Sequence, residues 1–158
     1  MSDEAIGEPV PYDDEDLRNR VRSTLDHCEL VNVRVVDFSA RLLTSNRPTT
    51  AKVSSETSYV ADDSTFANKY QWSVTLIDDD QTSVAELAAT LIVEYDVSER
   101  FVPDQEAAEA IAQSTGYFAA YPYVRELFHA HTARLQLNPL VLGMLMRDMP
   151  HPRAITTQ

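Results

Sequence analysis

The sequence predicts an α+β fold, with strands in the middle of the chain and helices in the last third. Between residues 31 and 97, apolar residues recur mostly at every second position, as in a strand with one buried face. After Pro103 they recur every three or four residues, as in an amphipathic helix. The chain of 158 residues is long enough for one domain and too short for two ordinary ones.

The N-terminal region is predicted to be an acidic segment followed by a helix. Residues 1–12 contain one glycine and two prolines, and we expect a mobile acidic leader there. A helix is predicted from about Asp13 to Glu29, because acids at its start suit both the N-cap and the positive end of the helix dipole. Its apolar stripe consists of Leu17, Val21, Leu25 and Cys28.

Four strands are expected in the middle of the chain. They cover Val31–Leu42, Lys52–Tyr59, Tyr70–Leu76 and Ala85–Val97. The alternation of the first strand changes phase after Val35, as a β-bulge would produce. The second is weaker and lies within a long mobile connection, residues 45–68. The third and fourth are joined by a turn at Asp78–Asp80, which predicts an antiparallel hairpin.

Two helices are predicted in the last third. The first starts at Pro103–Asp104 and stops at Gly116. The second begins near Pro122, since proline is tolerated in a first turn, and ends at Asn138–Pro139. It is apolar around more than half of its girth, which is typical of a helix covered from two sides.

The C-terminal end is predicted to divide into an apolar and a polar part. Leu140–Met146 is nearly all apolar, follows a helix stop and has no evident partner element. Residues 150–158 form a polar tail, so a single domain is expected over residues 13–149. The fourth strand exceeds the usual length and carries Ala88 and Ile92 on its second face, which suggests an oligomer that buries part of that face.

Charge and composition exclude several classes of function. The net charge of −12 argues against nucleic acids and anionic membranes, which require clustered Lys and Arg. The longest apolar stretches have seven residues, too few to cross a bilayer. A single cysteine, Cys28, cannot form an internal disulfide, and a cytoplasmic location is expected.

The sequence shows no pattern typical of an active site. None of the three glycines lies between Glu8 and Thr115, which removes the Gly-rich phosphate loops. On a helix, His129 and His131 point ~200° apart, so no metal site is predicted. No cofactor is expected, and the protein is predicted not to be an enzyme. A small enzyme with paired carboxylates remains an alternative, because sequence does not show which acids meet in space.

The segment Thr115–Glu126 resembles the hallmark of SecB chaperones, which have an aromatic residue and then Pro-Tyr-Ala-Arg-Glu at the start of their main helix. Here the matching residues are Tyr121, Pro122, Tyr123, Val124, Arg125 and Glu126. Leu135–Leu142 resembles the Leu-rich, proline-containing stretch that follows in the family. The resemblance covers roughly Leu30 to Met146. It is closest to the SecB-like proteins of actinobacteria, including those encoded beside toxin–antitoxin pairs.

The resemblance implies a four-stranded antiparallel sheet with helices packed on one face. It also implies a homotetramer, a dimer of dimers that sandwich their long helices. The implied function is an ATP-independent molecular chaperone, a holdase that binds unfolded polypeptides in hydrophobic grooves. The holdase would be either general or dedicated to clients such as an antitoxin or a subset of exported proteins. A non-catalytic interaction module that keeps the fold without client binding is the alternative.

The resemblance also suggests site residues. Candidates for the client groove are Val53, Tyr59, Trp72, Leu140, Leu142, Met144 and Met146, with core or dimer packing as the alternative for each. Candidates for the oligomer interface are Tyr121, Tyr123, Val124, Leu127, Phe128 and His131. Export chaperones of the family contact the SecA motor through carboxylates on the exposed sheet face. At the matching positions only Glu86 offers a charge, which argues against coupling to SecA.

Overall fold

The computed structural model describes residues 14–63, 65–98, 100–143 and the backbone of 154–155. The elements are α1 (Glu15–Asp26), β1 (Cys28–Leu42), β2 (Thr50–Ala61), β3 (Phe66–Ile77), β4 (Ser83–Val97), α2 (Gln105–Gln113), α3 (Thr115–Arg134), β5 (Val141–Leu142) and β6 (Ala154–Ile155). The predicted leader, Met144 and Met146 lie outside the described residues.

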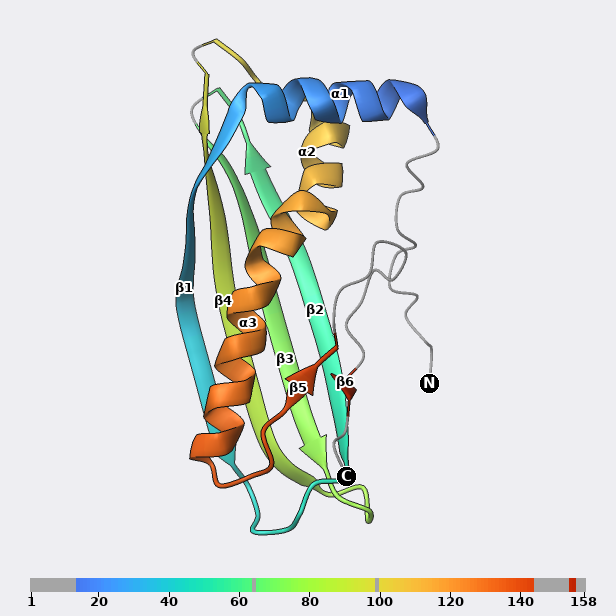
Figure 1. Cartoon of the computed structure of the whole chain (residues 1–158), viewed down its shortest axis with the longest axis vertical. Helices are drawn as coiled ribbons and strands as arrows, with labels where there is room; N and C mark the ends of the chain where they lie inside the picture. Colours follow the sequence, from blue (N-terminus) through green and yellow to red (C-terminus); the bar gives the residue numbers. More distant parts are fainter. Residues whose placement is uncertain (1–13, 64, 99, 144–153, 156–158) are drawn as a thin grey trace.

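The sheet has four antiparallel strands in the order β1-β4-β3-β2. The helices lie on one face of this sheet (Figure 1), where α3 contacts β1, β3 and β4 and α2 contacts β2. A second, two-stranded sheet pairs β5 with β6. The predicted α+β fold, with a four-stranded antiparallel sheet and helices on one face, is confirmed.

The predicted bulge in the first strand is confirmed. The pairing of β1 with β4 shifts register between Val35 and Asp37, so Val36 is the extra residue. A second shift, between Leu30 and Asn32, leaves Val31 in the same position and was not predicted. Two bulges keep the apolar residues on either side of them facing the helices despite the change of phase.

The hydrophobic core lies between α3 and the middle of the sheet. Trp72, Leu87 and Leu91 contribute its large side chains from β3 and β4, and each is at most 2% exposed. Val124 and Phe128 cover them from α3 and are fully buried. The alternation of buried and exposed residues along β3 and β4 follows from the pleat, which sends successive side chains to opposite faces.

The predicted helix boundaries at Gly116 and Pro122 are wrong. Helix α2 ends at Gln113, α3 begins at Thr115, and both residues lie inside α3. Gly116 permits close packing: a Cβ there would lie 2.2 Å from Asn68 Nδ2 and 2.4 Å from the Tyr70 hydroxyl oxygen. Pro122 is exposed, and because proline lacks an N–H it cannot donate the usual helical hydrogen bond to the carbonyl four residues earlier.

Other boundaries also differ from the prediction. The first helix is shorter, Glu15–Asp26, and is capped by Asp14, whose Oδ1 accepts from Asp16 N at 2.9 Å. The main helix ends at Arg134, before the predicted Asn138–Pro139. Strand β2 is longer than predicted, so the long connection around it is mostly strand. The expected polar tail contains β6.

Candidate functional site

The segment after α3 folds back along that helix and forms β5. Leu140 and Leu142 are 7% and 0% exposed, so both side chains are buried. Leu140 N–H donates to Thr132 Oγ1 at 2.8 Å, and the Tyr121 hydroxyl donates to the Gly143 carbonyl. Hydrogen bonds from α3 therefore hold both ends of β5. The buried side chains of Leu140 and Leu142 also pack this segment against the hydrophobic core.

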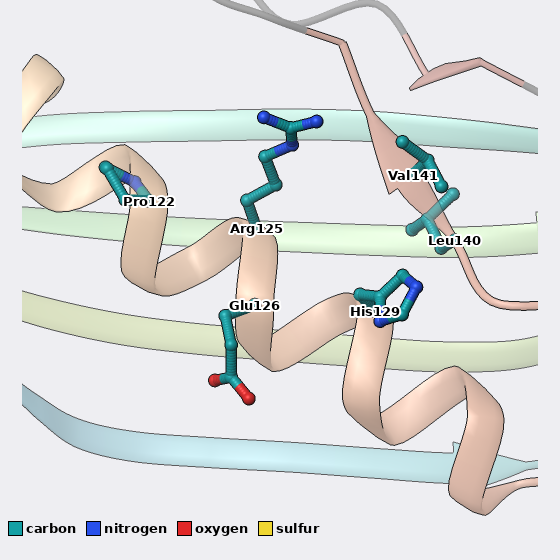
Figure 2. Close-up of a pocket in the computed structure, with 6 residues that line it drawn as sticks. All are labelled: Pro122, Arg125, Glu126, His129, Leu140 and Val141. Atoms are coloured by element: carbon teal, nitrogen blue, oxygen red, sulfur yellow. The ribbon is translucent and has the colours of Figure 1, made fainter.

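A groove of about 400 Å³ lies between α3 and this segment (Figure 2). It is lined by Pro122, Arg125, Glu126, His129, Leu140 and Val141. In Figure 2 the Arg125 guanidinium extends across the helix-covered face toward β2, while Glu126 points to the opposite side of α3. The groove thus combines apolar side chains with a few charged groups along its margin.

An aromatic cluster lies under the first half of α3. The ring centroid of Trp72 is 4.8 Å from that of Tyr117 and 5.7 Å from that of Tyr121. Burial raises the pKa of Tyr121 to about 12 and holds those of Tyr70 and Tyr117 well above their ordinary value. Among the described residues, Trp72 Nε1 is buried without a hydrogen-bond partner.

Strand β2 forms one edge of the sheet and is only partly covered by helices. We call its half-buried apolar residues on the helix-covered face the β2 strip: Ala51, Val53, Tyr59 and Ala61. They pack against the core from its margin. The Tyr59 hydroxyl donates to the Gln105 carbonyl at 3.4 Å, which ties the strip to α2. The strip therefore presents partly exposed apolar surface beside the outer edge of β2, which pairs with no further strand among the described residues.

The structure divides the predicted groove residues into two sets. Val53 and Tyr59 belong to the β2 strip and are accessible. Trp72, Leu140 and Leu142 are buried within the chain, which matches the packing alternative stated for them. Their binding roles, like those of Met144 and Met146 outside the described residues, stay predictions.

The predicted interface residues are also divided. Tyr121, Val124 and Phe128 face the sheet and are at most 4% exposed, so they are not on the outer surface of α3. Tyr123 is 49% exposed, and Leu127 and His131 are half-buried. The His131 ring lies against Phe38 of β1, with ring centroids 4.1 Å apart. Sequence reasoning missed Phe118, which is 46% exposed, because it placed the start of the helix after this residue.

The opposite face of the sheet carries Glu86. Its carboxylate lies 2.7 Å from the Arg41 guanidinium, and Glu94 is paired with Arg34 at the same distance. A shallow hollow of about 500 Å³ around Glu86 is lined by both polar and apolar residues, including Ser39, Thr75 and Ala88. The SecA contact predicted for Glu86 stays a prediction, and its charge is already paired within the chain.

Within the described ranges, no group of three or more His, Cys, Asp or Glu residues is placed to hold a metal ion. Burial raises the pKa of the Cys28 thiol, which disfavours the nucleophilic thiolate. The groove and the β2 strip are suited to bind a chain by contact, through apolar surface and backbone groups. No helix of the described part is long and apolar enough to cross a membrane.

Comparison with known proteins fits this geometry. No family model matches the chain. The SecB-like chaperone Rv1957 of Mycobacterium tuberculosis is 50% identical over 48 residues, which make up 30% of this chain and 26% of that relative. The SecB-like chaperone MT2006, from another strain of the same organism, matches to the same extent.

A solved structure matches over most of the chain. It is the SecB-like chaperone Rv1957 of M. tuberculosis in complex with a ChAD peptide from the Rv1956 HigA1 antitoxin. The TM-score is 0.73 at 26% identity, over 83% of this chain and 96% of that one. This chain resembles the SecB-like chaperones. The resemblance predicted from Tyr121–Glu126 is thereby confirmed, as is the SecB-like fold.

Proposed function

We propose that this SecB-like chain is an ATP-independent holdase, a non-enzymatic chaperone that binds unfolded or extended polypeptides. The observation that carries the proposal is the β2 strip, half-buried apolar surface on the helix-covered face, beside a strand edge that pairs with no further strand in the described part of the chain. An extended chain can bury its side chains on such a strip and use backbone groups at the edge. The net charge of −12 keeps a protein with exposed apolar surface soluble.

We further propose that an antitoxin is one client. The support is the similar SecB-like chaperone whose solved structure contains an antitoxin peptide. A dedicated client also agrees with the open face, where Glu86 is paired with Arg41 and does not display a free carboxylate for a motor protein. Cytoplasmic localisation belongs to this proposal, because both the client and the holdase role require a chain that meets newly made proteins.

The proposal is tested by aggregation of a chemically denatured client diluted into buffer. We expect the chain to suppress light scattering at stoichiometric ratios without ATP. Val53→Asp places a charge in the β2 strip and should weaken client binding at least ~tenfold, a loss of about 1.4 kcal/mol. Val60→Asp is the matched control, because Val60 lies on the same strand, is 53% exposed and faces the other side of the sheet.

Two results would count against the holdase. Unaltered aggregation with the wild-type chain contradicts it and favours an interaction module that keeps the fold alone. Equal effects of Val53→Asp and Val60→Asp would mean that the chain is a holdase but that the client does not bind at the β2 strip.

We also propose that the chain assembles into a homotetramer. Exposed apolar side chains lie on the outer surface of α3, at Phe118 and Tyr123, and on β1, at Leu30, Val31, Val35 and Val36. Burial of such residues between copies would stabilise an assembly. A solution mass near four times 17.8 kDa is expected. Tyr123→Glu should lower that mass, and a wild-type mass of one chain would contradict the assembly.

A further inference from the structure

The last described strand, β6, rests on two other strands. It pairs antiparallel with β5, with Val141 opposite Ile155 and Leu142 opposite Ala154. It also contacts β2, the edge strand that carries the β2 strip. Figure 1 shows this strand beside β2, on the helix-covered side of the sheet where α3 and β5 lie. A short extended segment of the chain therefore already lies against the surface proposed to bind extended polypeptides.

Strand β5 is anchored at both ends, and its described pairing with β6 is short. Strand β5 is fixed by the buried side chain of Leu142, by Thr132 at one end and by Tyr121 at the other. Strand β6 forms a ladder of two residue pairs. A ladder of two residue pairs is short, so opening β6 breaks few backbone hydrogen bonds compared with unfolding the domain. Local opening of this kind occurs in weakly held segments while the rest of the fold persists.

We propose that β5 is a backbone-pairing site for an extended client segment, and that β6 is an internal occupant displaced when the client binds. The inference rests on the proposed holdase function and adds the mode of binding. A strand that is anchored at both ends and paired with a short strand is a template on which one extended segment can replace another.

Strand exchange would also account for tolerance of many client sequences. Backbone N–H and C=O groups are the same in every polypeptide except at proline, so pairing with β5 places few demands on side chains. The groove beside β5, with Pro122, Leu140 and Val141, would receive apolar side chains of the client. Departure of β6 would also uncover the part of β2 that it contacts.

A reversible cross-link tests the exchange. Val141→Cys and Ile155→Cys place two thiols at directly opposed positions of an antiparallel pair, a spacing that a disulfide can span. Cys28→Ala supplies a background without the native thiol. The probe is fluorescein-labelled, reduced and carboxymethylated α-lactalbumin, which stays unfolded. We expect the oxidised protein to bind it at least ~tenfold more weakly than the reduced protein, while oxidant has no effect on the Cys28→Ala background.

The outcomes separate this inference from the holdase itself. Equal binding by oxidised and reduced protein overturns the exchange, and so does failure of the two cysteines to cross-link. If the unmodified chain does not bind the probe, the proposed function fails. A second measurement uses that unmodified chain: hydrogen exchange at residues 154–155 should accelerate when the probe binds, and unchanged or slower exchange contradicts displacement of β6.

Discussion

The two faces of the sheet differ in polarity and in burial. On the helix-covered face, Tyr70, Trp72 and Leu91 are buried under α3. On the open face, Arg34 pairs with Glu94 and Arg41 with Glu86, each at 2.7 Å. The same strands build both faces, because successive side chains alternate between them.

This difference indicates which face offers a polypeptide apolar surface to bind. Several polar groups of the open face bind one another: Ser54 Oγ, for example, lies 2.6 Å from Ser73 Oγ. A bound chain would gain little apolar contact there. The helix-covered face is mostly apolar, and its cover thins at the β2 strip. Binding is therefore expected at the margin of the buried face and not on the open one.

The largest effect on stability is expected from a substitution at Gly116, where α3 packs on the sheet. Gly116→Ala should destabilise the chain by about 3 kcal/mol, because the new Cβ would collide with Asn68 and Tyr70, and this exceeds the ~1 kcal/mol gained in helix propensity. Denaturant unfolding measures the loss. Thr115→Ala, at an exposed neighbouring position, is the control and should stay within ~0.5 kcal/mol of wild type. Unchanged stability of Gly116→Ala would mean that α3 does not pack this closely on the sheet.

Alkaline pH should lower the stability of the fold by an intermediate amount, through tyrosines buried on the helix-covered face. Burial raises the pKa of both Tyr95 and Tyr121 to about 12, above the ordinary tyrosine value of about 10. The unfolded chain therefore loses these protons first, so stability is intact below pH ~10 and falls as the pH rises toward ~12. Unfolding curves at pH 8, 10 and 11, with tyrosinate absorbance, measure the decline. Stability that is flat up to pH 11 would contradict the burial of these hydroxyls.

Substitutions on the open face should have the smallest effects on stability and on client capture. Glu86→Gln removes an exposed ion pair with Arg41, which should change the free energy of unfolding by less than about 1 kcal/mol. Capture of an unfolded client should be unchanged, and Val53→Asp provides the positive comparison. A loss of client capture by Glu86→Gln as large as that of Val53→Asp would show that the open face takes part in binding.

Much of the sheet could be predicted from the sequence because its signals are local. The two-residue period located the strands, and the phase change after Val35 located the bulge at Val36. Gly116 could not be interpreted in this way, since a glycine that ends a helix and one that permits close packing look alike in sequence. The residues opposite Gly116, Asn68 and Tyr70, are distant in the chain.

The site was harder to predict than the fold. Helix α3 carries apolar residues on several sides, so periodicity did not separate the inward Val124 and Phe128 from the outward Tyr123. Pairing of β5 with β6 is non-local and involves two residues on each strand, too few for a periodic signal. Edge position, which makes Val53 and Tyr59 candidates, depends on the strand order β1-β4-β3-β2 and is not visible in β2 alone.

Photo-crosslinking from β2 tests the central claim most directly. A benzophenone amino acid placed at position 53 or at position 60 reports which face of the same strand touches a bound unfolded polypeptide. The account predicts cross-links to the polypeptide from position 53 and few or none from position 60. Cross-links mainly from position 60, or none from either position at a client concentration that saturates binding, would contradict it.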